Sequence, residues 1–147
     1  MVRRLAWILA FVGAAVFAVL TVMMFSERTQ VRIPAIAGLV TLSAVVLSFL
    51  GGIEAGLALN EREPGSNEGT RALAFLLGAV PALAAWGVLW LPSPHWQLSA
   101  SLTLMVGVWI TDLWLARLGL VPSWFVDMRT AVTAVAGAIL GVAIYRI

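Results

Sequence analysis

The chain of 147 residues contains no cysteine, and all nine of its basic residues are arginine. The absence of cysteine excludes disulfide bonds, thiolate metal sites and cysteine nucleophiles. A single histidine excludes haem ligation by two histidines of the same chain. The charged residues form no run of one sign that would bind a polyanion. We therefore expect no metal, no cofactor and no nucleic-acid partner.

Charge of either sign is also scarce. Only 11% of the residues are charged and 62% are hydrophobic, whereas a soluble domain has about 25% charged and roughly 45–50% apolar residues. This composition excludes an ordinary water-soluble globule and a disordered tail. It predicts a protein that crosses a membrane several times.

Five apolar stretches are each near the length of about 20 residues that a helix needs to cross the hydrocarbon layer. Alternation of apolar and polar residues with period two is absent, so helices rather than barrel strands are expected. The first stretch is longer than the roughly 7–15 apolar residues of a signal peptide, so we expect it to be retained. We predict an all-α bundle, with residues 1–147 forming one transmembrane domain. The predicted helices are residues 5–25, 33–59, 71–91, 97–118 and 124–145.

The arginines indicate how these helices are oriented, because cytoplasmic loops of membrane proteins are enriched in positive charge. With a cytoplasmic N-terminus, six arginines lie inside and three lie outside. We therefore predict a cytoplasmic N-terminus and a C-terminus on the opposite side, where Trp86, Trp90 and Trp96 would form an aromatic belt. The lysine-free composition, rich in Ala and Val, is typical of a GC-rich bacterium, so the expected location is the bacterial inner membrane.

Three charged residues lie five or more residues inside the apolar stretches: Glu54 in the second, Asp112 in the fourth and Arg129 in the fifth. At 1.5 Å per residue, all three lie roughly 7–9 Å inside the same cytoplasmic boundary. Such residues cost at least about 2.5–3.5 kcal/mol within a bilayer and are functional candidates by default. This layer is either a polar site or proton relay open to the cytoplasm, or a structural ion pair. Side chains that reach the headgroups are a further structural interpretation.

Asp112 has no oppositely charged neighbour one turn away on its own helix, because Val108 and Ala116 occupy those positions. Its partner must come from another helix, from the headgroups or from water. The fourth and fifth stretches are joined by a short connection at Pro122, so we expect their helices to be adjacent. We predict that Arg129 approaches Asp112 or Glu54.

Small residues recur every four positions in two of the stretches, a spacing that lets helix backbones approach closely. On this basis we expect the second helix to be the central one, with a close contact along this stripe. The candidate packing residues are Ala44, Ser48, Gly52 and Gly56 in the second stretch and Gly137 and Gly141 in the fifth.

Residues 46–59, with the sequence VLSFLGGIEAGLAL, resemble the hallmark of domain-of-unknown-function family 3429, whose animal members include transmembrane protein 69. The family pattern, Leu-Ser-Phe-Leu-Gly-Gly-Ile followed by a basic residue, Trp and Gly, matches residues 47–53 and Gly56. This chain departs from it with Glu54 and Ala55, which reverses the charge at that position. The resemblance implies an integral membrane protein without an established activity. Further matches are Pro81, Trp86, Asp112, the segment 122–124, Met128, Arg129 and Thr133.

Small size, short connections and the lack of a catalytic constellation predict a protein that is not an enzyme and has no catalytic residue. The function predicted first is an accessory or assembly subunit of a larger membrane complex. The alternative is a small-molecule or proton carrier, or a ligand-binding membrane protein, that uses the layer of Glu54, Asp112 and Arg129. The expected partners are the lipid bilayer and either other membrane subunits or a second copy of the chain.

Overall fold

The computed structural model describes residues 2–58, 68–119 and 121–147, and these residues form five long helices without a strand. All five are long and apolar enough to cross a membrane, which confirms the predicted all-α bundle of five transmembrane helices. The helices are α1 (Val2–Met24), α2 (Thr29–Ala58), α3 (Glu68–Val88), α4 (Pro94–Arg117) and α5 (Ser123–Arg146).

The helix boundaries follow local signals that lie outside the apolar stretches. Ser93 caps α4 by accepting a hydrogen bond from the Trp96 backbone N–H, and Pro94 occupies the first helical turn. Gly119 follows the end of α4 with a φ of +75°, which glycine adopts without strain. Four helices, α1 to α4, begin three or four residues earlier than predicted, because polar residues continue a helix beyond its apolar part. The predicted end of the second helix at Leu59 lies outside the described residues.

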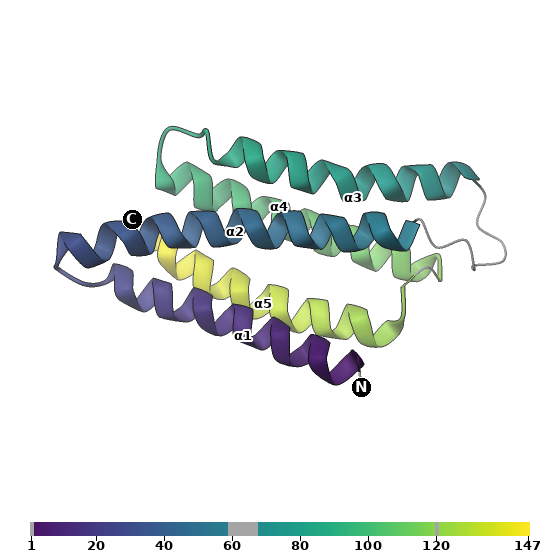
Figure 1. The fold of residues 1–147 in the computed structure, drawn as a ribbon, viewed down its shortest axis with the longest axis horizontal. Coiled ribbons are helices and arrows are strands. Elements are labelled where there is room, and N and C mark those ends of the chain that lie inside the picture. The colour runs from purple at the N-terminus through teal and green to yellow at the C-terminus, as the bar shows by residue number, and fades with distance from the viewer. Residues whose placement is uncertain (1, 59–67, 120) are drawn as a thin grey trace.

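Four of the helices enclose a common interior. Helix α2 packs against α1 and α4, and α5 packs against the same two helices from the other side. Helix α3 lies outside this ring, against α2 and α4. Consecutive helices run antiparallel, so the N-terminus and the C-terminus lie at opposite ends of the bundle (Figure 1). The core of the ring is aliphatic and includes the buried residues Leu39, Leu47, Leu98 and Leu140.

The closest backbone contact joins α2 to α3 through Gly51 and Gly78. A Cβ atom added to Gly51 would overlap the Gly78 carbonyl oxygen, and one added to Gly78 would lie 2.7 Å from the Gly51 oxygen. A side chain at either position would force the two helices apart. The α2–α3 pair is accordingly the most extensive helix contact in the bundle.

This contact corrects the predicted packing stripe. Ser48, Gly52 and Gly56 are exposed, and a Cβ atom at Gly52 or Gly56 would meet nothing within 4 Å. Adjacent residues are about 100° apart around a helix. Gly51 therefore faces α3, whereas Gly52 lies on a different side of α2. Only Ala44 of that stripe is buried.

The two candidate packing glycines of α5 also differ from expectation. A Cβ atom at Gly137 would make an ordinary contact of 3.5 Å with the Leu102 side chain of α4, whereas one at Gly141 would meet nothing within 4 Å. Neither glycine is therefore needed for a close approach of backbones. The ring of four helices is held by side-chain packing, and the glycine contact is confined to α2 and α3.

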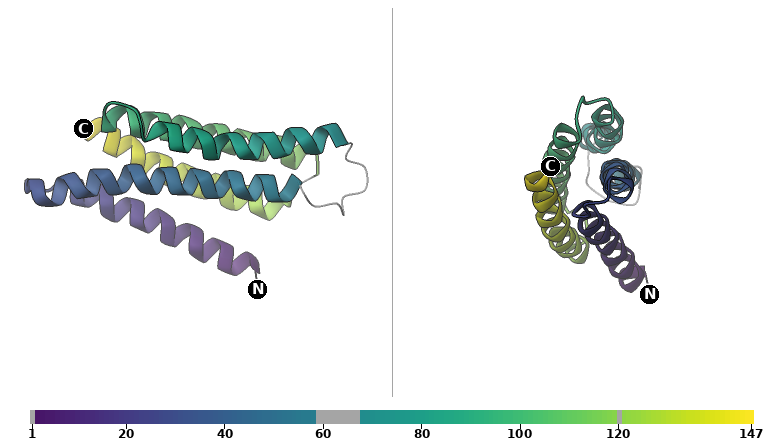
Figure 2. Two further views of the ribbon diagram at one scale, coloured as in Figure 1. Left: turned by 45° about the horizontal axis from the view of Figure 1, so that its top comes forward. Right: turned by 90° about the vertical axis from the view of Figure 1, so that its left-hand side faces the viewer.

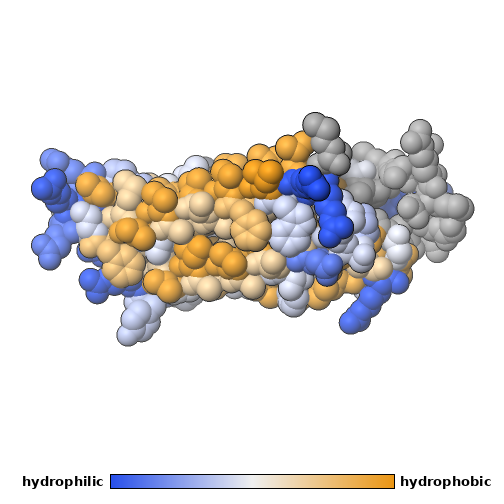
Figure 3. Space-filling view, turned by 90° about the horizontal axis from the view of Figure 1, so that it is seen from below, coloured by the Kyte–Doolittle hydropathy of each residue, from blue (hydrophilic) through white to orange (hydrophobic). Residues whose placement is uncertain are grey.

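The outer surface is apolar around the middle of the bundle. Figure 3 shows hydrophobic side chains over the middle of one face and hydrophilic side chains toward its two ends. The exposed hydrophobic residues include Leu9, Phe49 and Leu83. A protein in water rarely exposes an apolar surface of this extent, so this surface faces lipid.

Candidate functional site

The three charged residues of the predicted layer all lie inside the bundle. The exposed fraction is 1% for Glu54 on α2, 1% for Asp112 on α4 and 4% for Arg129 on α5. The side chains of Asp112 and Arg129 both act electrostatically on the Glu54 carboxyl group. The structure thus brings the predicted layer together from three helices, and none of its members reaches the headgroups by snorkelling.

Asp112 and Arg129 form the interhelical contact that their shared depth predicts. The Arg129 Nε–H donates a hydrogen bond of 2.7 Å to Asp112 Oδ2. A second polar contact joins the same two helices one turn away, where the Trp109 indole N–H donates to Thr130 Oγ1 at 2.9 Å. These two contacts, one buried and one exposed, join α4 to α5.

Glu54 belongs to the cluster but takes no part in this pair. Neither of its carboxyl oxygens has a hydrogen-bond partner among the described residues, although both are fully buried. The cluster therefore combines two carboxyl groups with one guanidinium group, and Glu54 interacts with both Asp112 and Arg129 across it. An ionisable residue buried in a membrane helix is a functional candidate.

Arg129 is itself only partly satisfied. Its Nη2 atom is buried and has no hydrogen-bond partner among the described residues, and the same is true of Thr133 Oγ1. Thr133 follows Arg129 by four residues, so both side chains project from the same face of α5. This face borders a cavity that opens to the outer surface at Leu9 and Phe49.

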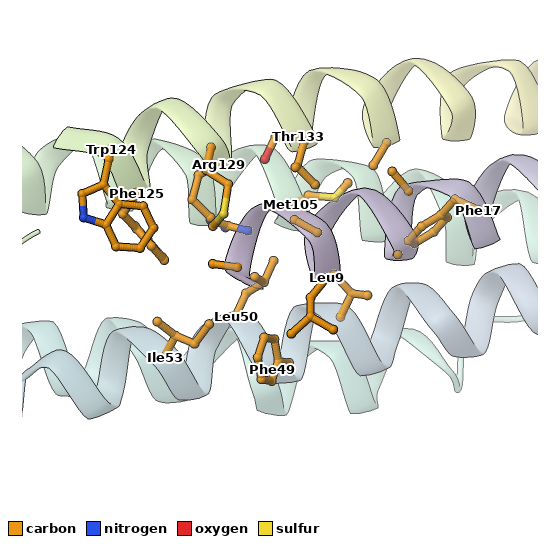
Figure 4. Close-up of a pocket in the computed structure, with 18 residues that line it drawn as sticks. Leu9, Phe17, Phe49, Leu50, Ile53, Met105, Trp124, Phe125, Arg129 and Thr133 are labelled. Atoms are coloured by element: carbon orange, nitrogen blue, oxygen red, sulfur yellow. The ribbon is translucent and has the colours of Figure 1, made fainter. Parts of the chain in front are cut away.

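The cavity has a volume of about 410 Å³, within the range of roughly 300–1,000 Å³ typical of ligand sites. It lies between α1, α2 and α5, with Met105 of α4 also in its wall. Figure 4 shows Arg129 and Thr133 on one side and Phe49, Leu50 and Ile53 of α2 on the other. Apart from the Arg129 and Thr133 side chains, the lining is apolar. The lining aromatic residues are Phe17, Phe49, Trp124 and Phe125.

The first half of α1 covers the cavity without packing closely on the bundle. The first buried residue of this helix is Ala14, and Figure 2 shows α1 diverging from α2 toward the N-terminus. Its cavity-lining residues here include the small side chains Ala6 and Ala10 and the glycine Gly13. A Cβ atom at Gly13 would meet nothing within 4 Å, so this wall stands back from the opposite one.

The Arg129 and Thr133 side chains can donate hydrogen bonds to a molecule in the apolar cavity. The carboxyl groups of Asp112 and Glu54 interact with Arg129. No group of three His, Cys, Asp or Glu side chains that could hold a metal ion occurs in the described part of the chain. Sequence reasoning found Arg129 but missed Thr133 as a site residue, although the spacing of four residues on one helix was a usable signal. The α1 wall gave no such signal, because its residues are apolar and small.

Comparison with known proteins places the chain in a family. Neither a curated protein nor a solved structure matches it. A family model does match, over residues 2–145, so the match extends beyond the segments of the sequence resemblance and includes α1. The chain therefore belongs to the family described as "Protein of unknown function (DUF3429)".

Proposed function

We propose that this protein binds a small apolar molecule inside the membrane, in the cavity between α1, α2 and α5. The observation that carries the proposal is the Arg129 side chain. It is 4% exposed, yet its Nη2 atom has no partner among the described residues and it lines the cavity. A bound molecule with a hydrogen-bond acceptor would satisfy this donor.

A purely structural ion pair does not account for the whole arrangement. Its role would be complete with the hydrogen bond between Arg129 and Asp112. It would require neither a cavity beside the guanidinium group nor a second unpartnered polar atom, that of Thr133, in the same wall. In lipid, buried polar atoms find hydrogen-bond partners within the protein or in a bound molecule. Leaving one without a partner costs about 1–3 kcal/mol for a neutral group and more for a charged one.

The accessory or assembly role remains a second prediction, based on the small size and the short connections of the chain. The two functions differ in what stays bound to the protein when detergent extracts it from the membrane. A binding protein retains a small molecule in its cavity, whereas an accessory subunit retains a larger complex. One purification in mild detergent followed by native mass spectrometry distinguishes them.

The decisive comparison uses two matched glycine variants. In Gly13→Leu the new side chain extends into the cavity, while in Gly52→Leu it extends outward from α2, and neither Cβ atom meets another atom within 4 Å. We expect the wild-type protein and Gly52→Leu to carry a bound small molecule and Gly13→Leu to have lost it. Binding of the same molecule to all three proteins, or a wild-type protein found only within a larger complex and without a bound molecule, would contradict the proposal.

A further inference from the structure

We infer that the cavity is built for an uncharged molecule with a carbonyl oxygen, which accepts hydrogen bonds from Arg129 and Thr133. This inference rests on the proposed function and specifies the chemical class of the ligand. Three features of the site lead to it: the donor character of the free polar atoms, the charge already present behind them, and the apolar nature of the remaining wall.

The free polar atoms require an acceptor. A guanidinium group only donates hydrogen bonds, and a threonine hydroxyl group donates one. Arg129 Nη2 and Thr133 Oγ1 are both buried without a partner among the described residues, and their residues are one turn apart on the same face of α5. A carbonyl oxygen has two lone pairs and can accept from both sides. A ligand whose polar group were an ammonium ion would leave Arg129 unsatisfied.

The charge of the site argues against an anionic ligand. Asp112 already provides the counter-charge of Arg129 through a hydrogen bond of 2.7 Å. Glu54 adds a second carboxyl group that interacts with both of them. A ligand carboxylate would bring a third acidic group to the same guanidinium group in a medium of low dielectric constant, where repulsion between like charges is strong. The acceptor that fits is therefore neutral.

The rest of the molecule must be apolar. Phe17 lies toward one end of the site and Trp124 and Phe125 lie toward the other, with aliphatic side chains between them (Figure 4). Because the lining residues Leu9 of α1 and Phe49 of α2 are also exposed on the outer surface, a molecule dissolved in the lipid can enter laterally. Two kinds of membrane compound share the required chemistry: quinones with an apolar ring and acyl esters with an apolar chain.

The test is a binding measurement in bilayer discs of ether-linked phosphatidylcholine, a lipid without ester carbonyl groups. The carbonyl probes are 2-methyl-1,4-naphthoquinone and methyl laurate, which separate the quinone from the ester. Their matched controls are 2-methylnaphthalene, with the same ring system and no oxygen, and laurate, with the same chain and an anionic head. Saturable binding is measured by equilibrium dialysis and by the ligand-induced rise in the thermal unfolding midpoint.

We expect at least one carbonyl probe to bind at least tenfold more tightly than its control. Thr133→Val, which replaces the hydroxyl group by a methyl group of similar size, should weaken that binding roughly three- to tenfold. Thr130→Val is the matched control, because Thr130 accepts from Trp109 and lies outside the cavity wall. It should leave the affinity unchanged.

The outcomes separate the two proposals. If each carbonyl probe binds no better than its own control, or if Thr133→Val binds as well as the wild-type protein, the inferred ligand class is wrong, while the cavity remains a binding site. If laurate binds best, the charge argument is wrong. If no probe binds saturably and lipid chains alone fill the space, the proposed function fails together with the ligand class.

Discussion

The Asp112–Arg129 pair lies away from both water and headgroups, so the two charges depend on each other. Truncating one partner leaves an uncompensated charge in a medium of low dielectric constant, while truncating both removes the charge and its cost together. The pair therefore has a characteristic energetic signature. The effects of the two substitutions are not additive.

We expect Arg129→Ala to lower the free energy of unfolding by roughly 1–5 kcal/mol, because Asp112 then lacks its counter-charge. The double variant Arg129→Ala/Asp112→Ala should be less destabilised than Arg129→Ala alone. Denaturant unfolding in detergent measures both values. Arg117→Ala serves as the control, since Arg117 is an exposed arginine of α4, and it should change stability by less than about 0.5 kcal/mol.

The pair was predictable from sequence because depth and composition constrained it strongly. Asp112 has no partner on its own helix, and Arg129 lies at the same depth on the helix that follows. Thr133 could not be assigned in the same way, since a threonine in a membrane helix is usually satisfied by its own backbone. Its unpartnered hydroxyl group became evident only once the adjacent cavity was known.

At the scale of helices, Gly51 and Gly78 set how close α2 and α3 can approach. A methyl group at Gly51 would overlap the backbone of α3 at Gly78, and backbone cannot move aside as a flexible side chain can. The neighbouring Gly52 faces open space. The two adjacent glycines therefore form a natural pair for comparison.

We expect Gly51→Ala to destabilise the protein by roughly 1–3 kcal/mol through overpacking. Gly52→Ala should be neutral or stabilise the protein by up to about 1 kcal/mol, because alanine favours the helix and meets no neighbour. Thermal unfolding midpoints in the same detergent measure the difference. Equal midpoints for the two variants would show that α2 and α3 can separate without cost, contrary to the glycine contact.

The sequence pattern led to the wrong glycine for a physical reason. In a soluble helix the polar face shows which side is buried, but lipid-facing residues are as apolar as core residues. The stripe of Ser48, Gly52 and Gly56 thus looked like an interface although it is exposed. Glu54 was the more reliable indicator of the buried side, because an ionisable residue in a membrane helix almost always faces the interior of the bundle.

At the scale of the whole molecule, the number of helices follows from the sequence but the ring does not. Five stretches of sufficient length specify five crossings. Nothing in them specifies that α3 lies outside while α1 closes the ring against α5, since apolar side chains can pack on either side of each helix. That arrangement depends on the combined fit of all the side chains.

Orientation in the membrane remains a prediction from the arginine count, and the chain is well suited to testing it. Because no native cysteine is present, a variant with a single cysteine carries one reactive thiol group. With a cytoplasmic N-terminus, a membrane-impermeant maleimide should label Glu27→Cys in intact cells and should label Arg117→Cys only after permeabilisation. Glu27 lies in the connection between α1 and α2, Arg117 ends α4, and both side chains are exposed. The reverse labelling pattern would invert the proposed topology.

The position of Arg129 on α5, after both acids in the chain, has a consequence for biosynthesis. Glu54 and Asp112 lie on α2 and α4, which leave the ribosome before α5. During this interval the nascent bundle holds two carboxyl groups and lacks the guanidinium group that pairs with Asp112. The wall that α1 shares with α5 is also missing. Synthesis of α5 is therefore the step at which charge compensation and the cavity first exist together.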